Sequence, residues 1–257
     1  MKIATWNVNS IRTRLQIVTD WLQQHQVDVL CLQETKVQDH QFPRSPFEDL
    51  GYNLYISGQK SYNGVAIFSL QPLTEVSYGF GSIVGDTALD EQKRVITGVA
   101  GDVRIVNLYV PNGSAIGSDK YQYKLVWLKT LREYLQILQA DGHQICVCGD
   151  FNIALEDKDI YTDKGRDKHI MSSPIEREAL KQVLELGFQD AFRKFTAERH
   201  YSWWDYRSGG FARNRGWRID HHYLTEKLYQ QAANCWIDVE PRKLEKPSDH
   251  APVIVEF

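Results

Sequence analysis

Eight short runs rich in β-branched and aromatic residues, each bounded by turn-forming residues, constrain the fold of this chain most strongly. The runs cover residues 2–8, 27–33, 64–70, 94–100, 102–110, 144–150, 218–225 and 251–257. They have the length of β-strands, so the sequence excludes an all-helical fold. The fourth and fifth runs meet at Gly101 and predict a hairpin in which alternate residues, from Val103 to Tyr109, share one face.

Helices are predicted where apolar residues recur every three to four positions. Three such stripes are Ile11, Leu15, Val18 and Leu22; Leu125, Leu128, Leu131, Leu135 and Leu138; and Ile175, Ala179, Val183 and Leu186. The third segment also has boundary signals, with Ser173 as N-cap, Pro174 and Glu176 in the first turn, and Gly187 after the end.

Strands that alternate with helices, together with a strand-to-strand hairpin, favour an α/β fold of two packed mixed β-sheets flanked by helices. The 257 residues contain no linker rich in Pro, Gly or Ser, so we expect a single domain over residues 1–257. No stretch approaches the roughly 18 apolar residues of a membrane-spanning helix, and the N-terminus lacks the apolar segment of a secretory signal. We therefore expect a cytoplasmic protein without a membrane partner.

The four cysteines are Cys31, Cys146, Cys148 and Cys235, and we expect them to be reduced core residues. Cys146 and Cys148 are two positions apart, with neither a CxxC motif nor a nearby pair of histidines. This spacing does not favour a zinc site.

Charge is nearly balanced over the whole chain, with 30 Lys and Arg against 33 Asp and Glu and a formal net charge of −3. A polyanionic partner would therefore have to meet a local basic patch. Residues 193–218 contain seven basic and only two acidic residues, interleaved with aromatic side chains. Composition alone leaves two interpretations open for them, a solvated basic face over core aromatics or a nucleic-acid interface.

Polar side chains gather where the predicted strands end, which is the usual place for a site in α/β folds. They are Asn7, Asn9, Glu34, Tyr109, Asn112, Asp150, Asn152, Asp220, Asp249 and His250. Carboxylate and amide oxygens without cysteine suit Mg²⁺ or Mn²⁺ rather than zinc. His250 is either a group that holds an anion or moves a proton, or a buried structural histidine.

Several strings between residues 5 and 253 carry a family resemblance. They are TWNVNSIR, DVLCLQETK, NLYVPNG, GDFNIA, YSWWDYRSGGF, NRGWRID and KPSDHAPV. Together they resemble the exonuclease III family of abasic-site endonucleases, bacterial in type, within the endonuclease/exonuclease/phosphatase superfamily. LQET, GDFN and SDH are shared across the superfamily and indicate a metal-dependent phosphoesterase. YVPNG, SWWDYRS and RGWRID are typical of its DNA-repair branch.

The resemblance implies a four-layer α/β sandwich with a metal site at one rim. It makes Glu34 the principal ligand and places Asn7, Asp249, Asp150 and Asn152 close to the metal. Asn at position 7 limits the negative charge of the site, and the choice between one and two Mg²⁺ ions stays open.

The same resemblance implies roles in phosphodiester hydrolysis, which needs an in-line water, charge neutralisation and help for the leaving group. Asp150 orients or deprotonates the attacking water, while Asn152 and His250 hold the phosphoryl oxygens. Asp220 orients His250, and Tyr109 contacts the scissile phosphate or the leaving oxygen.

For the substrate, the resemblance implies a binding set of Asn9, Asn112, Trp203, Arg207, Trp217 and Ile219. Trp203, Trp217 and Ile219 wall a pocket for an extrahelical abasic sugar, whose extrusion costs less where no base is stacked. Arg207 stands where relatives insert a side chain into the duplex. The phosphate-contacting arginine of animal relatives has no counterpart after YVPN here, and Lys120 and Lys124 are the cations at hand.

The expected function is a Mg²⁺-dependent phosphodiesterase, active as a monomer on double-stranded nucleoid DNA. It incises 5′ to abasic sites and removes 3′-terminal nucleotides and blocking groups in base excision repair. Two alternatives stay open, a phosphoesterase of the same fold with a non-DNA substrate and a non-catalytic DNA-binding relative. Against the second, Glu34, Asp150, Asp220 and His250 are all present. The charged loop 155–172 has no assigned role, and its Lys164, Arg166 and Lys168 are candidate DNA contacts.

Overall fold

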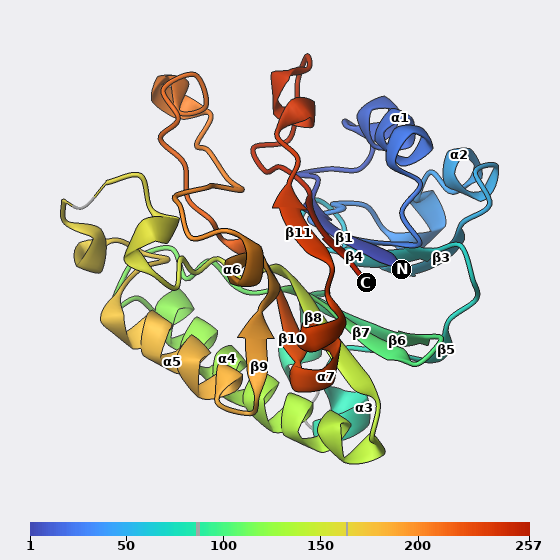
Figure 1. Cartoon of the computed structure of the whole chain (residues 1–257), viewed down its shortest axis with the longest axis horizontal. Helices are drawn as coiled ribbons and strands as arrows, with labels where there is room; N and C mark the ends of the chain where they lie inside the picture. The colour runs from blue at the N-terminus through green and yellow to red at the C-terminus, as the bar shows by residue number, and fades with distance from the viewer. Residues whose placement is uncertain (86–87, 163) are drawn as a thin grey trace.

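The computed structural model describes residues 1–85, 88–162 and 164–257. Its centre is a pair of six-stranded mixed β-sheets that pack face to face, with helices on their outer faces (Figure 1). This arrangement confirms the predicted α/β class and the four layers of two mixed sheets flanked by helices.

The first sheet contains the two ends of the chain. Its strands are β1 (Lys2–Asn7), β2 (Val29–Gln33), β3 (Asn53–Ser57), β4 (Val65–Ser69), β11 (Asn234–Ile237) and β12 (Val253–Glu256). They are ordered β11-β12-β1-β2-β4-β3, and β1 and β2 run parallel while the other neighbours are antiparallel. Asn7 is paired with Gln33, so Asn7 and Glu34 emerge at the same rim.

The second sheet repeats this pattern. Its strands are β5 (Thr74–Tyr78), β6 (Val95–Ala100), β7 (Val103–Tyr109), β8 (Gln144–Asp150), β9 (Phe188–Asp190) and β10 (Asp220–Thr225). They are ordered β5-β6-β7-β8-β10-β9, with β7 and β8 parallel. Asp150 is the partner of Tyr109 on one side and of Asp220 on the other, so adjacent strands deliver all three to one rim.

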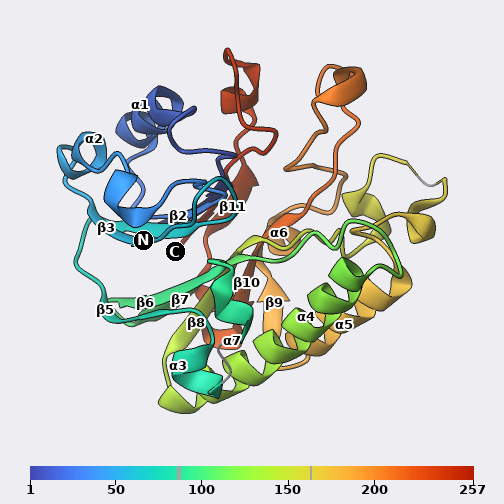
Figure 2. The same ribbon diagram turned by 180° about the vertical axis from the view of Figure 1, so that it is seen from behind.

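Helices cover the outer face of each sheet (Figure 2). They are α1 (Leu15–His25) and α2 (Ser45–Glu48) on the first sheet and α3 (Gly81–Val84), α4 (Asp119–Leu138) and α5 (Pro174–Leu184) on the second. Two short helices, α6 (Ala191–Phe195) and α7 (Glu226–Gln231), contribute Phe192 and Leu228 to the core between the sheets.

The core between the sheets is largely apolar and contains a pair of buried amides. Gln33 and Asn107 are fully buried and belong to opposite sheets. Gln33 Nε2 donates to Asn107 Oδ1 at 2.7 Å, and Asn107 Nδ2 donates to the carbonyls of Leu32 and Ala66 at 3.0 and 2.9 Å. These hydrogen bonds join the two sheets directly beneath the rim that carries Glu34 and Tyr109.

All eight predicted strands are confirmed, and they are the four inner strands of each sheet. The four strands that the sequence did not predict, β3, β5, β9 and β11, are the edges. An edge strand has one unpaired side and is more exposed, so its sequence needs less apolar and β-branched character. β5, TEVSY, has no buried residue at all.

The predicted helices exist, but two of them begin elsewhere. α1 begins at Leu15 instead of Ile11, and α4 begins at Asp119, after the N-cap Ser118. α5 has the predicted capping box of Ser173 and Glu176. Its apolar stripe was partly wrong, because Ile175 is 58% exposed whereas Glu176 is fully buried.

The cysteines are free and buried, as expected. Strand pairing places His222 opposite Cys148, with its Nδ1 3.6 Å from Cys146 Sγ and its Nε2 3.0 Å from the Val253 carbonyl. The sulfur atoms and an imidazole nitrogen lie within 4.8 Å of one another, a grouping that the local spacing could not reveal. In the described ranges, none of the helices has both the length and the apolar character needed to cross a bilayer.

A network of buried ion pairs holds the loop that contains Asp159. Arg218 donates to Asp159 Oδ1 at 2.7 Å and to Asp190 Oδ2 at 2.7 Å, and Arg193 also contacts Asp159. Burial alone would raise the pKa of Asp159, but the two guanidinium groups and His221 lower it to about 2. Asp159 therefore stabilises the fold as a carboxylate.

The stability of the protein should depend on Asp159 between about pH 4 and pH 2. Because the pKa in the folded state is below the unfolded value, the stabilisation is complete above the unfolded pKa and disappears as the pH falls through about 2. This shift corresponds to a contribution of about 2 kcal/mol to the free energy of unfolding, and roughly half of that contribution is lost at pH 3. Urea unfolding of wild type and Asp159→Asn should show a difference in free energy of unfolding that shrinks by about 1 kcal/mol between pH 5 and pH 3. A difference that stays constant with pH would contradict this role.

Candidate active site

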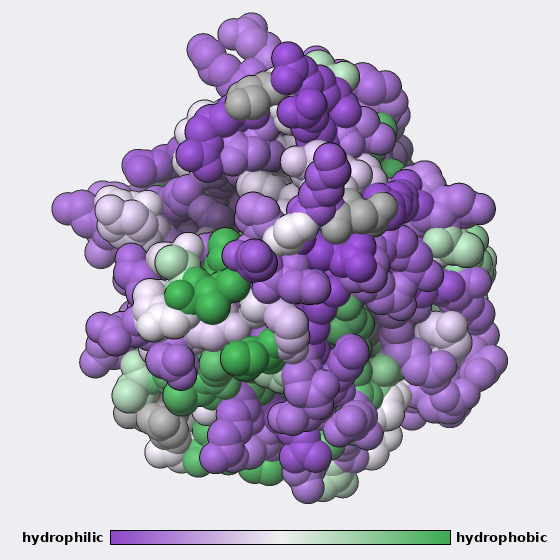
Figure 3. Space-filling view, turned by 90° about the vertical axis from the view of Figure 1, so that its left-hand side faces the viewer, coloured by the Kyte–Doolittle hydropathy of each residue, from purple (hydrophilic) through white to green (hydrophobic). Residues whose placement is uncertain are grey.

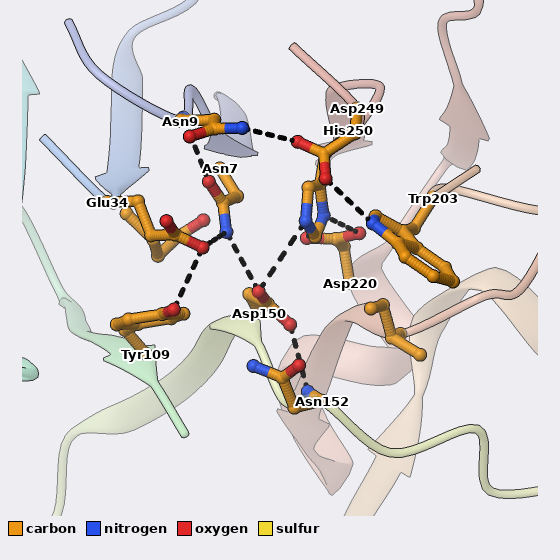
Figure 4. A network of polar contacts seen from close by, with 12 residues as sticks. Asn7, Asn9, Glu34, Tyr109, Asp150, Asn152, Trp203, Asp220, Asp249 and His250 are labelled. Atoms are coloured by element: carbon orange, nitrogen blue, oxygen red, sulfur yellow. Dashed lines mark hydrogen bonds and ion pairs between the residues drawn. The ribbon is translucent and has the colours of Figure 1, made fainter. Parts of the chain in front are cut away.

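The polar residues predicted at the strand ends meet at one rim of the sandwich (Figure 4). The first sheet contributes Asn7 from β1 and Glu34 after β2, and the second contributes Tyr109, Asp150 and Asp220. Both parallel strand pairs end at this rim, which explains why residues far apart in the sequence become neighbours.

Asn7 joins the two sheets at the centre of the cluster. Its Nδ2 donates to Glu34 Oε1 and to Asp150 Oδ2, both at 2.9 Å. The Tyr109 hydroxyl also donates to Glu34 Oε1 at 2.8 Å, and Lys36 Nζ lies 2.7 Å from Glu34 Oε2. Burial alone would raise the pKa of Glu34, but the Lys36 ammonium and the Asn7 amide hold it below its ordinary value. Glu34 is therefore ionised at neutral pH.

The backbone of the site adopts conformations that most residues avoid. Asn9, Glu34 and Asn152 have φ angles of 44°, 50° and 49°. Such left-handed conformations cost free energy in residues other than glycine and cluster at functional sites. Gly149 meets a different requirement, because a Cβ there would lie 2.0 Å from the Leu108 carbonyl oxygen. Only glycine allows β8 to approach β7 so closely just before Asp150.

His250 lies between two buried carboxylates. Its Nδ1 is 3.0 Å from Asp220 Oδ2, and its Nε2 is 3.8 Å from Asp150 Oδ2. Ser202 Oγ donates to Asp220 Oδ2 at 2.6 Å and fixes that carboxylate. Burial lowers the pKa of His250, but Asp220 and Asp150 outweigh it and raise the pKa to about 10. His250 is thus an imidazolium at neutral pH.

In Asp150 the surroundings disfavour the ionised form of the carboxylate. Burial raises its pKa to about 7, and Asp220 and Glu34 add to the rise, while His250 and Asn7 oppose it. Its Oδ1 accepts a hydrogen bond from the Asn152 backbone N–H at 2.9 Å. A carboxylate with this pKa can take up and release a proton near neutral pH.

Tyr109, Asn112 and Asn152 complete the site. Asn112 Nδ2 donates to Asn152 Oδ1 at 3.0 Å. The Arg94 guanidinium stacks over the Tyr109 ring, 4.5 Å from its centroid, and donates to the Tyr109 carbonyl at 3.1 Å. Burial, Glu34 and Asp150 raise the pKa of Tyr109 well above its ordinary value, so the phenol stays protonated.

Asp249 lies at the edge of this cluster. Its Oδ1 accepts from Asn9 Nδ2 and its Oδ2 accepts from Trp203 Nε1, both at 3.0 Å. Lys36 Nζ lies 2.5 Å from Asn9 Oδ1, so Asp249 is connected to Glu34 through Asn9 and Lys36. The sequence did not single out Lys36, although it is the last letter of LQETK.

A cavity of about 590 Å³ opens beside Trp203 and Trp217. Arg207 lies at its side and is held by Asp205 at 2.8 Å. Ile219 is only 1% exposed and belongs to the apolar cluster behind Trp217, so it supports the wall instead of lining the cavity. Arg215 of the basic segment also lines the cavity, together with residues that the sequence did not indicate, among them Tyr161, His169 and Met171.

The basic segment 193–218 divides into two parts. Arg193, Lys194 and Arg218 are bound internally, and Lys194 Nζ donates to three backbone carbonyls. Arg207, Arg213 and Arg215 are exposed. The side of the molecule with α5 and the neighbouring loops is largely hydrophilic, with a smaller apolar patch (Figure 3). The internally bound part fits neither interpretation, so the choice between a solvated basic face and a nucleic-acid interface concerns the exposed part alone.

A second cavity of about 590 Å³ adjoins Tyr109 and Asn112, and Arg94 and Lys120 line it. Lys124 is not available to a phosphate, because its side chain is fully buried against Glu176. In loop 155–172, Lys164 and Lys168 are exposed and Arg166 is paired with Asp157 at 2.6 Å; Asp163 lies outside the described residues.

The donor set fits a hard divalent cation. Glu34 and Asp150 bring the hard oxygen ligands of two carboxylates to the two sides of Asn7, whose Nδ2 faces both of them and whose Oδ1 accepts from the Asn9 backbone N–H. Burial is the main cause of the raised pKa of Asp150, and the charges of Asp220 and Glu34, which a cation would offset, add to it. Asp150, Asp220 and His250 also have ligating atoms within 4.8 Å of one another. Because Asp220 and His250 are already paired, the side of the cluster formed by Glu34, Asn7 and Asp150 suits a cation better.

Comparisons with known proteins agree with this geometry. The model of the Endonuclease/Exonuclease/phosphatase family matches residues 4–250. Exodeoxyribonuclease III of Haemophilus influenzae is 35% identical over 270 residues, which cover 100% of both chains. An AP endonuclease structure from Archaeoglobus fulgidus has a TM-score of 0.95 at 42% identity and covers 100% of this chain and 99% of that one. The 3′ phosphatase NExo from Neisseria, solved with a product DNA hairpin, has a TM-score of 0.95 at 38% identity and the same coverage.

Proposed function

The chain belongs to the Endonuclease/Exonuclease/phosphatase family, and from this we propose a Mg²⁺-dependent DNA-repair nuclease that incises duplex DNA 5′ to abasic sites. It also removes nucleotides and blocking groups from 3′ ends and leaves 3′-hydroxyl groups. The names of its relatives, exodeoxyribonuclease III, AP endonuclease and 3′ phosphatase, support both activities. One observation carries the proposal. The cluster of carboxylates, amides and an imidazole adjoins an aromatic cavity, because Trp203, which lines the cavity, donates a hydrogen bond to Asp249 of the cluster.

In this proposal Glu34, Asn7 and Asp150 hold the cation, with Asp249 and Asn152 at its edge. Mg²⁺, or Mn²⁺ in its place, supplies charge neutralisation at the phosphoryl oxygens. Hard oxygen donors and the absence of sulfur from these five side chains support the choice of metal.

Asp150 orients the attacking water and accepts its proton on a carboxylate oxygen. His250 carries a proton on Nε2 and donates it as a hydrogen bond to a phosphoryl oxygen, while Asp220 holds the ring through Nδ1. Asn152 donates to a second phosphoryl oxygen through its Nδ2. The protonated Tyr109 hydroxyl, with Asn112 nearby, assists the leaving oxygen. The raised pKa values of Asp150, His250 and Tyr109 suit these roles.

The cavity beside Trp203 and Trp217 receives the extruded abasic sugar, and Arg207 and Asn9 contact the flanking DNA. The aromatic side chains of Tyr161, Trp203 and Trp217 in its wall favour a sugar that carries no base. A non-DNA phosphoester substrate remains the second candidate, but the exposed Arg207, Arg213 and Arg215 beside this cavity favour a polyanionic strand.

We further propose that residues 1–257 form one domain that acts as a monomer in the cytoplasm. Strands from both halves of the chain share the core between the sheets, which supports a single domain. The four free cysteines agree with a reducing compartment.

Incision of an end-labelled duplex that contains one tetrahydrofuran abasic analogue tests the proposal. We expect a single product cut 5′ to the lesion in Mg²⁺, no product in EDTA, and no internal cut in an undamaged duplex. A 3′ ladder on both duplexes without that product would indicate an exonuclease that lacks abasic-site recognition. No cleavage of either duplex would favour a non-DNA phosphoester, to be tested by phosphate release from inositol phosphates.

A further inference from the structure

Lys124 of α4 is a cation in an unusual place. Its side chain is fully buried, and Nζ has three acceptors: the carbonyl of Asn152 at 2.8 Å, the carbonyl of Asn112 at 3.2 Å and Glu176 Oε1 at 2.5 Å. An ammonium group has three hydrogens, so every donor is used inside the protein.

Two of these acceptors belong to residues of the site. The Asn112 and Asn152 side chains bond to each other at 3.0 Å, and the Asn152 backbone N–H donates to Asp150. Lys124 binds the main-chain carbonyls of the same two residues. The loops after β7 and β8 are therefore joined twice, once through their side chains and once through the buried ammonium.

The third acceptor leads to the wall of the cavity beside Trp203 and Trp217. Glu176 closes the capping box of α5, where its Oε2 accepts from the backbone N–H and the hydroxyl of Ser173. Its Oε1 also accepts from the Met171 backbone N–H at 3.1 Å, and Met171 lines the cavity. A single buried ion pair thus connects the phosphate-binding asparagines with the sugar pocket.

On the basis of the proposed function, we propose that Lys124 is a positioning residue that, together with Glu176, sets the placement of Asn152 and Asn112 relative to the cavity wall at Met171. Hydrogen bonds from an ammonium group are directional, whereas apolar packing is not. A methionine at position 124 would fill similar space but leave two carbonyls without this donor and the buried Glu176 carboxylate without its cation. The loop of Asn152, whose backbone is already left-handed, would then lose one of the contacts that fix it.

A double-mutant cycle on incision of the abasic duplex tests this inference. Lys124→Met should lower kcat by about 10- to 100-fold, the scale of a small misplacement at a reacting centre, with KM and DNA affinity nearly unchanged. If Lys124 acts through Asn152, Lys124→Met should have little further effect on kcat in an Asn152→Ala background. A structural role alone would instead lower the amount of folded enzyme by the same factor in both backgrounds.

Arg104→Met is the matched control, because Arg104 is also a buried cation but lies at the opposite end of β7. It should lower thermal stability and leave kcat unchanged. Should Lys124→Met fail to fold, Lys124→Met/Glu176→Gln removes both buried charges, and it should show the same loss of kcat and the same coupling to Asn152. The inference would be overturned if a folded Lys124→Met variant had an unchanged kcat. It would also be overturned if the effects of Lys124→Met and Asn152→Ala on kcat multiplied fully. Absence of incision by the wild-type enzyme would instead refute the proposed function.

Discussion

Replacement of Asp150 by asparagine is expected to lower the turnover number for abasic-site incision by about 10²- to 10⁴-fold, the scale of a lost general base. The amide cannot accept the proton of the attacking water, and it is a weaker ligand for a cation. The fold should survive, because burial raises the pKa of Asp150 to about 7 and a neutral side chain avoids that desolvation. The melting temperature of Asp150→Asn should therefore be no lower than that of the wild type.

Single-turnover incision, thermal unfolding and binding of labelled abasic duplex separate these effects. Asp141→Asn is a suitable control, because Asp141 precedes the same strand β8 at its far end and is half exposed. It should leave incision unchanged. Wild-type turnover by Asp150→Asn would contradict the catalytic role assigned to Asp150.

Glu34→Ala should weaken the response to Mg²⁺ and lower maximal turnover by at least about 100-fold. Glu34 is the carboxylate that Asn7, Tyr109 and Lys36 all contact, and its lowered pKa keeps it charged at neutral pH. Its removal deletes an anionic ligand and leaves the Lys36 ammonium beside the cation.

The measurement is the incision rate over a range of Mg²⁺ concentrations, whose half-saturation point should move upwards in Glu34→Ala. Glu48→Ala serves as control, since Glu48 is an exposed glutamate on α2 that pairs with Arg44. An unchanged Mg²⁺ curve for Glu34→Ala would mean that the cation binds elsewhere.

The sequence predicts those strands of the fold that are buried, because burial requires a recognisable run of apolar and β-branched residues. Inner strands such as β1 and β8 are buried along almost their whole length because both faces are covered, and the sequence locates them well. Edge strands such as β5 have no such requirement and were missed. In α5 the capping box of Ser173 and Glu176 was predicted correctly, but the burial of Glu176 was not, because its partner Lys124 is 52 residues away in the sequence.

The residues of the candidate site could be named from the sequence, but their contacts could not. Asn7 and Asp150 are 143 residues apart, and only strand order brings them within a hydrogen bond of each other. Arg94 carries no signal in the sequence because its contact with Tyr109 depends on the pairing of β6 with β7. Ile219 was expected to wall the pocket, but its side chain is buried in the apolar cluster of Trp217, Ile160 and Met171, which the sequence does not reveal.

The amide pair of Gln33 and Asn107 has a consequence for the tolerance of the core to change. Apolar packing is not directional, and a shear between the sheets would alter the distance between Glu34 on one sheet and Tyr109 on the other. The directional bonds of Gln33 and Asn107 oppose such a shear within two residues of both side chains. The spacing of the reaction centre therefore depends on these bonds as well as on the volumes of the surrounding aliphatic side chains. Substitutions that conserve volume among these side chains should leave the chemistry at the rim in place.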